Sequence, residues 1–272
     1  MSTHSAVASR SRESASPTGA GRRSLLLGVV GFGILIGVWY LVWLSGLVSR
    51  SLFPRPDEVA RAAWVGFAER DLARDMGVSI MRVLLGVAIG TGLAVPVGFL
   101  LAWYRPLRYM FDPLVSFFRA LPPIALVPLV IVYLGIGEQA RVSILVWASF
   151  FASVVVIYEG IAAVDEIYIR AARVLGATEW EIFGKVVVRV AIPQIFVALR
   201  VALGVSWATL VAAELLAANN GLGAVIQNAG NFFQIEVIYV GIILIGALAL
   251  TMDHVLKKVM ARFVRWQERV ER

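Results

Sequence analysis

Long apolar runs alternate with short polar segments along most of this chain. An α-helix needs roughly 20 apolar residues to cross the hydrocarbon core of a membrane, and six runs are about that long. They cover residues 24–47, 79–103, 113–134, 142–164, 194–217 and 236–253. The pattern therefore predicts an all-α integral membrane protein with six transmembrane helices.

Two of the six runs have features that set them apart. In the third run, Arg119 and three prolines interrupt the apolar pattern, so its helix is the weakest of the six predictions. A secretory signal peptide is the alternative interpretation of the first run. The apolar part of a signal peptide, however, spans only about 7–15 residues, and this run is longer. We interpret residues 24–47 as an uncleaved membrane helix.

The segments outside these runs define the domain organisation. Residues 1–23 are rich in Ser, Arg and Ala without apolar periodicity, which predicts a disordered cytoplasmic tail. Residues 24–256 form the six-helix transmembrane domain, and residues 257–272 a cytoplasmic C-terminal tail. A polar stretch after the first run contains an amphipathic piece near residues 57–74.

Glycine pairs spaced four residues apart occur within two of the runs. They are Gly33 with Gly37 in the first run and Gly86 with Gly90 in the second. Such pairs allow two helix backbones to approach closely in a membrane. We expect both pairs to serve helix packing.

Composition and charge agree with a membrane protein. Hydrophobic residues make up 60% and charged residues 16% of the 272, whereas a soluble domain has about 45–50% and roughly 25%. With a cytoplasmic N-terminus, the inner segments hold sixteen Lys and Arg and the outer segments five. This asymmetry places both termini in the cytoplasm. It also explains the net charge of +7, so nucleic acid is not expected as a partner.

Several kinds of chemistry are excluded by the residue inventory. The chain has no Cys, and its two His, His4 and His254, lie far apart in sequence. No metal site, catalytic residue or intramembrane enzyme activity is therefore expected.

The segment IRAARVLGATEWEIFGK, residues 169–185, is unusually polar for this chain. Its first part carries a helical apolar stripe made by Tyr168, Ala171, Ala172 and Leu175. Gly176 follows, and glycine adopts turn conformations that other residues resist. The stripe and the glycine predict a short helix that ends in a turn.

A second short helix is predicted directly after this turn. Thr178 and Glu181 have the spacing of a capping box, which starts a helix. Trp180 and Phe183 then share one face of it.

Charge narrows the role of this helix pair. Residues 165–189 hold four acids and four bases, so neither DNA nor an anionic lipid surface is favoured. A docking element for another protein and a packed loop both remain open.

The segment resembles the cytoplasmic coupling loop of bacterial ABC-importer permeases, whose pattern is Glu-Ala-Ala, three residues, then Gly. Ala171, Ala172 and Gly176 match it, while Arg170 stands in the place of the Glu. Three other stretches resemble the nitrate/sulfonate/taurine group of these permeases, and the last is most similar to taurine permeases. They are LFPRPDEV (52–59), FRALPPIALVPLVIVYLGIGE (118–138) and LRVALGVSWATLVAAELLAANNGLG (199–223).

The resemblance implies a type I importer permease in a bacterial inner membrane. Such a permease works as a pair, here a homodimer, with two ATPase subunits below and a solute-binding protein outside. The chain contains no G-x-x-x-x-G-K-[ST] phosphate loop. It is thus expected to bind no cofactor, while the partner ATPase uses ATP and Mg. The implied substrate is taurine or another aliphatic sulfonate, with nitrate, bicarbonate or an aromatic acid as alternatives.

The same resemblance assigns a coupling loop at about 165–193. Its expected ATPase-coupling residues are Arg170, Ala171, Ala172, Gly176, Thr178, Trp180, Glu181 and Phe183.

Polar residues within the predicted helices are candidates for the translocation path. They are Arg119, Pro122, Ser206, Trp207, Thr209 and Glu214. Charged residues at membrane depth usually face the bundle interior, where they line a path or tie helices together. An ion- or proton-coupled secondary transporter, using Glu159 and Glu214, is the alternative function.

Overall fold

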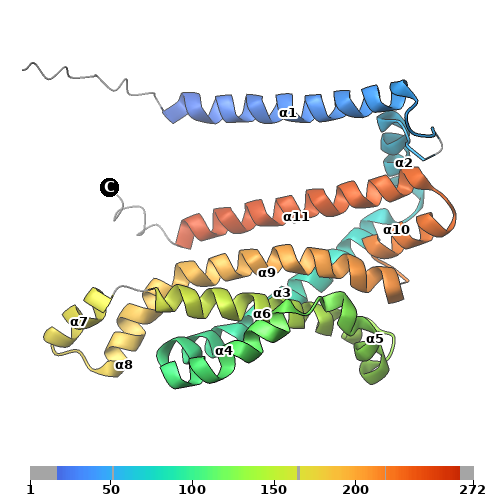
Figure 1. Cartoon of the computed structure of the whole chain (residues 1–272). Coiled ribbons are helices and arrows are strands. Elements are labelled where there is room, and N and C mark those ends of the chain that lie inside the picture. Colours follow the sequence, from blue (N-terminus) through green and yellow to red (C-terminus); the bar gives the residue numbers. More distant parts are fainter. Residues whose placement is uncertain (1–16, 51, 164–165, 218, 264–272) are drawn as a thin grey trace, which may run out of the picture. The chain divides into compact units, whose positions relative to one another are not determined.

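The computed structural model of the chain describes residues 17–50, 52–163, 166–217 and 219–263. Helices and short connections account for these ranges, which contain no strand (Figure 1). The helices are α1 (Pro17–Ser45), α2 (Pro56–Glu69), α3 (Leu72–Trp103), α4 (Arg105–Ala120), α5 (Pro123–Leu134), α6 (Glu138–Ala162), α7 (Glu166–Val174), α8 (Glu179–Ile182), the π-helix η1 (Phe183–Val187), α9 (Val188–Ala217), α10 (Leu222–Asn231) and α11 (Ile235–Phe263). The predicted all-α class is confirmed.

The chain divides into two compact units, Met1–Glu58 and Val59–Arg272. In the first unit, the segment after α1 folds back onto the end of that helix. The indole Nε1 of Trp39 donates to the carbonyl oxygen of Pro54 at 3.0 Å, and the Tyr40 hydroxyl donates to Asp57 at 3.1 Å.

Both predicted tails differ in part from the structure. Residues 17–23, expected to be disordered, form the first turns of α1. At the other end α11 continues to Phe263, into the expected C-terminal tail. Residues 1–16, with His4, and residues 264–272 lie outside the described ranges.

Three long helices form the centre of the second unit, where α6 packs along both α3 and α9. Glycines of α3 permit its contact with α6. A Cβ on Gly90 would lie 2.6 Å from the Cβ of Ser149, and a Cβ on Gly86 would collide with Leu145. The expected role of the Gly86/Gly90 pair is confirmed. At Gly33 and Gly37, a Cβ would meet no described atom within 4 Å, so the expected role of this pair stays a prediction.

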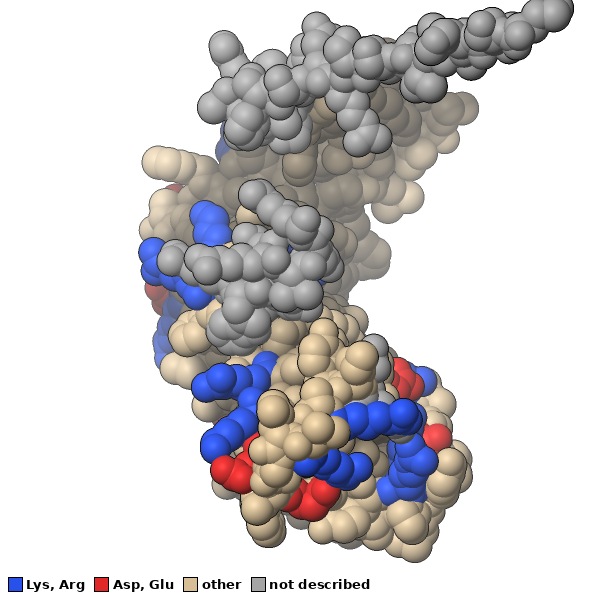
Figure 2. Space-filling view, turned by 90° about the vertical axis from the view of Figure 1, so that its left-hand side faces the viewer, with Lys and Arg blue, Asp and Glu red and all other residues tan. Residues whose placement is uncertain are grey.

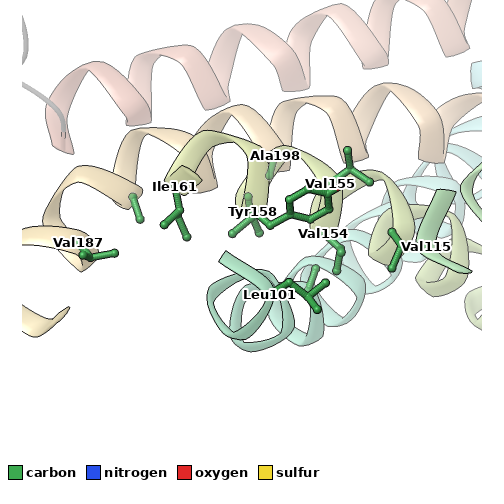
Figure 3. Packing of buried hydrophobic residues seen from close by; sticks show 11 residues of the cluster. Leu101, Val115, Val154, Val155, Tyr158, Ile161, Val187 and Ala198 are labelled. Carbon is green, nitrogen blue, oxygen red and sulfur yellow. The ribbon is translucent and has the colours of Figure 1, made fainter. Parts of the chain in front are cut away.

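The largest apolar core holds these helices together at the end where α3 meets α4. Figure 3 shows side chains of α3, α4, α6, η1 and α9 converging there. The labelled members are Leu101, Val115, Val154, Val155, Tyr158, Ile161, Val187 and Ala198. Since η1 contributes Val187, this core anchors the charged segment to the bundle.

Four runs among the described residues are long and apolar enough to cross a membrane: α3, α6, the continuous stretch Glu179–Leu215 and α11. The predicted third helix, 113–134, is not one helix. It is a pair, α4 and α5, bent by 92° at Leu121–Pro122, and it adds a fifth span if counted as one. Pro122 and Pro123 lack amide donors and therefore end the helical hydrogen bonding here. The described apolar part of α1, Val30–Ser45, is shorter than a span, so the first of six predicted spans stays a prediction.

Candidate functional site

The charged segment begins with α7, whose end has the geometry of a Schellman motif. The amide of Ala177 donates to the carbonyl of Ala172, and the amide of Gly176 donates to that of Arg173, both at 3.0 Å. Gly176 has a φ of +82°, in the left-handed region that favours glycine. The turn expected at this glycine is therefore confirmed.

The next helix, α8, starts with the predicted capping box. The Thr178 side chain accepts from the amide of Glu181 at 3.3 Å, and the Glu181 carboxylate accepts from the amide of Thr178 at 3.0 Å. An ion pair of Arg173 with Glu179, at 2.9 Å, joins the two short helices across the turn. Local contacts thus define the conformation of this segment.

Large apolar side chains lie exposed on this segment. They are Ile167, Tyr168, Val174, Leu175 and Trp180, with Trp180 85% exposed. We call these five residues the coupling surface. Figure 2 views the chain from the side that carries α7 and α8, where Lys and Arg side chains lie among acidic and uncharged residues. The apolar stripe of α7 is therefore not covered by the rest of the described chain.

The two aromatic rings of this segment have different surroundings. Phe183 packs edge-on against Trp103, at 5.2 Å between ring centroids, and against Phe99, at 5.7 Å. Both partners belong to α3, so Phe183 fastens the segment to the bundle. Trp180 and Phe183 line one hollow beside α3, as expected for two rings on one face. Phe183 is half-buried against α3, whereas Trp180 is 85% exposed.

The segment continues without a break into the membrane helix. Residues Glu179–Leu215 form one span that includes α8, η1 and α9. A single π-helical turn, Phe183–Val187, lies between its two α-helical parts. Such turns occur often at functional sites in helices. Trp180 of the coupling surface and Glu214 therefore lie at opposite ends of one helical element.

At the far end, Glu214 is buried and forms an ion pair with Arg82 of α3. Nη1 of Arg82 lies 2.6 Å from a Glu214 carboxylate oxygen, and both side chains are at most 2% exposed. Arg82 also pairs with Glu138, the first residue of α6, at 2.5 Å. Glu138 in turn pairs with Arg141 at 2.6 Å. Arg82, Glu214 and Arg141 are buried, whereas the Glu138 side chain is 57% exposed. We call these four residues, named for their three buried members, the buried charge network.

This network also binds the start of α10. The backbone amides of Gly221, Leu222 and Gly223 donate to Asp75, Ser79 and Glu214, at 2.7, 2.9 and 2.7 Å. Gly221 has a φ of +111°, and a Cβ there would collide with the Glu214 carboxylate and Arg82. The three amides are helix N-terminal donors that have no intrahelical acceptor, and side chains of α3 and α9 supply acceptors. Glu214 therefore joins helices, the structural alternative that the sequence left open.

The partners of Glu214 were not predicted from the sequence. Arg82 lies in the predicted span 79–103, and an Arg at membrane depth needs a partner. That signal was available for Arg82. Which acid pairs with it depends on contacts across more than 130 residues, which a single sequence does not reveal.

Three further path candidates are buried by packing within this chain. The hydroxyl of Ser206 lies 2.8 Å from that of Ser149 on α6, and Thr209 donates to the carbonyl of Val205 on its own helix at 2.8 Å. Trp207 is 4% exposed and belongs to an apolar cluster with Val83, Val87, Leu145, Ala202, Leu203 and Leu210. These contacts favour a packing role for Ser206, Thr209 and the ring of Trp207, while the buried indole Nε1 of Trp207 has no acceptor within the described residues.

The remaining candidates, Arg119 and Pro122, lie at the break between α4 and α5, and both are exposed. Arg119 occupies the last turn of α4. It is thus apart from the buried charge network.

Comparison with known proteins identifies the family. A model described as binding-protein-dependent transport system inner membrane component matches residues 94–269. A probable ABC transporter permease of Brucella abortus (strain 2308) is 43% identical over 89% of this chain and 96% of its own length. The taurine transport system permease protein of Escherichia coli (strain K12) is 32% identical over 92% of both chains.

A solved structure shares the fold. A chain of the MetNI methionine ABC transporter, in an inward-facing conformation, superposes with a TM-score of 0.64 at 21% identity. The match covers 71% of this chain and 96% of the other.

The chain belongs to the family of binding-protein-dependent transport system inner membrane components. It is an ABC-importer permease subunit of the inner membrane, of the sulfonate/nitrate/taurine group, and not an enzyme. Family membership sets aside the alternative of a secondary transporter.

Proposed function

We propose that two copies of this chain form the translocation path for taurine or a closely related aliphatic sulfonate. A solute-binding protein delivers the solute from outside, and two separate ATPase subunits bind ATP and Mg and drive the cycle. This permease chain itself binds neither ATP nor Mg. The similarity to the taurine permease over nine tenths of both chains supports this substrate class.

The observation that carries the proposal is the exposure of the coupling surface. Soluble surfaces rarely expose a contiguous group of large apolar side chains unless they bind a partner. Here five such residues project from a segment that a Schellman turn and a capping box hold rigid. We assign the ATPase subunit as the partner, with Trp180 as the principal anchor.

The continuous helix Glu179–Leu215 transmits the movement of the ATPase pair across the permease. Over Glu179–Leu215 an α-helix rises roughly 55 Å. Closure of the ATPase pair moves the coupling surface at one end, and Phe183 carries that movement to α3. At the other end Glu214 moves α3, α6 and α10 together through the buried charge network. The bundle then tilts as a rigid body, a common route to alternating access.

Transport by the purified complex tests the substrate. Permease, ATPase and solute-binding protein are reconstituted in liposomes loaded with ATP and Mg. We expect uptake of radiolabelled taurine that requires all three components, and competition by short alkyl sulfonates. Uptake of nitrate, bicarbonate or benzoate without taurine uptake contradicts the sulfonate assignment and leaves the coupling assignment in place.

Cysteine labelling tests the proposed orientation. Because the chain has no Cys, a single Cys at the exposed Leu175 or at the exposed Asn219 has no background. In intact cells we expect a membrane-impermeant maleimide to label Asn219→Cys and to leave Leu175→Cys unlabelled until the membrane is opened. The reverse pattern places the coupling surface outside, where no ATPase subunit can reach it.

A further inference from the structure

A small aromatic pocket lies at the break between α4 and α5. It has a volume of about 190 Å³, and its lining includes Phe118, Arg119, Trp147, Phe151, Val201 and Val205. The rings of Phe118, Trp147 and Phe151 lie 4.6–5.3 Å apart between centroids and form one aromatic wall. Val201 and Val205 add α9 to the lining.

The pocket lies beside the inner parts of two long helices and not at their ends. Trp147 is nine residues after the start of α6, which corresponds to about 14 Å along the helix. Val201 lies near the middle of α9. Substrate sites of transporters commonly lie beside discontinuous helices, and the pair α4 and α5 is such a break.

Arg119 is the one charged residue of the described lining. It is exposed, and it forms no ion pair or hydrogen bond within the described residues. The lining there contains no Asp or Glu that would compensate its charge. An anion in the pocket would supply acceptors for its guanidinium donors.

The chemistry of the lining selects the kind of anion. Arg presents a planar fork of donors that suits a sulfonate or carboxylate. The aromatic wall suits a short hydrocarbon arm, and its ring faces attract an ammonium group. A pocket of this volume is below the usual size for drug-like ligands, which starts near 300 Å³. The expected ligand therefore has only a few non-hydrogen atoms.

We propose that this pocket is a solute site within the permease, which binds a small organic anion with a sulfonate or carboxylate head on a short arm. Arg119 holds the head, and the rings of Phe118, Trp147 and Phe151 cover the arm. Taurine, with its sulfonate and ammonium on two carbons, is the probe of choice. The assignment of taurine rests on the proposed function, whereas the preference for an anion rests on the pocket alone.

Thiol labelling of the assembled complex in nanodiscs tests the site. A Val201→Cys variant places a thiol in the pocket lining at a position that is 41% exposed. Val197→Cys, one turn away, 38% exposed and outside the lining, is the matched control. Each thiol is reacted with sulfonatoethyl methanethiosulfonate, which is anionic, and with its trimethylammonium analogue, which is cationic. The ratio of the two rates reports the local preference for an anion.

We expect this ratio at Val201→Cys to fall about tenfold when Arg119→Gln is added, the effect of one nearby charge in partly screened surroundings. Arg119→Lys keeps the positive charge and should retain most of the anion preference. At Val197→Cys the change should be much smaller. Taurine should slow labelling at Val201→Cys when Arg119 is present, and Arg119→Gln should weaken this protection.

The outcomes separate the two proposals. Taurine uptake by the complex with no effect of Arg119 on the rate ratio, and no protection by taurine, overturns the pocket. An Arg119-dependent anion preference in a complex that carries no taurine supports the pocket and contradicts the substrate. The cationic reagent, whose rate should rise or stay constant in Arg119→Gln, shows that the variant remains folded and accessible.

Discussion

The two ends of the helix Glu179–Leu215 are stabilised in opposite ways. At the coupling end, contacts join residues within a few positions of each other: Thr178 with Glu181, and Arg173 with Glu179. At the other end, Glu214 contacts Arg82, 132 positions away, and neither side chain is exposed beyond 2%. The first end leaves its apolar side chains exposed, whereas the second covers its charges.

This difference gives the two ends of one helix different functions: one end binds a partner, and the other holds the bundle together. A local, self-contained segment keeps its shape when a partner binds and leaves, because its contacts do not depend on the bundle. A buried network holds α3, α6, α9 and α10 in one arrangement, since every charge needs its partner there. The coupling end can thus receive a movement that the other end shares among four helices.

Removing one partner of the buried pair should have the largest effect. Arg82→Gln leaves Glu214 as an uncompensated buried charge, which typically costs about 3–5 kcal/mol. Glu214→Gln should cost less, because Arg82 keeps its ion pair with Glu138. We expect a large loss of folded permease, measured by thermal unfolding and by size exclusion in detergent. The control is Arg200→Gln, which breaks the pair with Asp253 on a more exposed surface and should change little. If Arg200→Gln loses as much folded permease as Arg82→Gln, burial does not distinguish the network from a surface ion pair.

Glycines with positive φ at the two ends allow a second test. Gly221→Ala adds backbone strain and a collision with Glu214 and Arg82, together about 2–4 kcal/mol. Gly176→Ala adds the strain alone, about 1 kcal/mol, because no described atom lies within 4 Å of the new Cβ. The difference between the two unfolding temperatures measures the collision. Similar temperatures indicate that α10 moves away from Glu214 at little cost.

The sequence predicts the coupling end well because its determinants are local. Gly176, Thr178 and Glu181 have the spacing of a turn and a capping box, and both are present. The exposed Trp180 also follows from the polar surroundings of its helix. The contacts of Phe183 do not follow from the sequence, because its partners, Phe99 and Trp103, lie on a different helix.

Long-range geometry limits what the sequence reveals elsewhere. The apolar runs locate α3, α6, α9 and α11, but apolarity does not indicate that residues 113–134 bend by 92°. The aromatic pocket at that bend combines α4, α5, α6 and α9. Arg119 was identified as a candidate by its charge, whereas its neighbour Trp147 carried no local signal.

Truncating the two aromatic rings of the coupling segment should separate partner binding from folding. Trp180→Ala removes an exposed anchor, and such anchors are often worth 2 kcal/mol or more at an interface. We expect weakened ATPase co-purification and uptake at a normal amount of permease. Phe183→Ala removes packing against α3 and should cost roughly 2 kcal/mol of stability. We expect a lower unfolding temperature for the isolated permease. Loss of stability in Trp180→Ala, with the ATPase still bound, contradicts the assignment of the coupling surface.

The smallest effect should come from the cap of α8. Thr178→Ala removes the side chain that accepts from the Glu181 amide, and loss of an N-cap typically costs about 1 kcal/mol of helix stability. Because α8 has only four residues, this loss should loosen the segment while the bundle stays folded. We expect an unchanged unfolding temperature, faster amide hydrogen exchange within residues 176–183, and partial loss of ATPase-coupled uptake. Thr178→Ser, which keeps the acceptor, should restore all three readouts. Faster exchange that extends to residues 206–214 instead contradicts the separation of the two ends, because it shows that the local cap also stabilises the buried charge network.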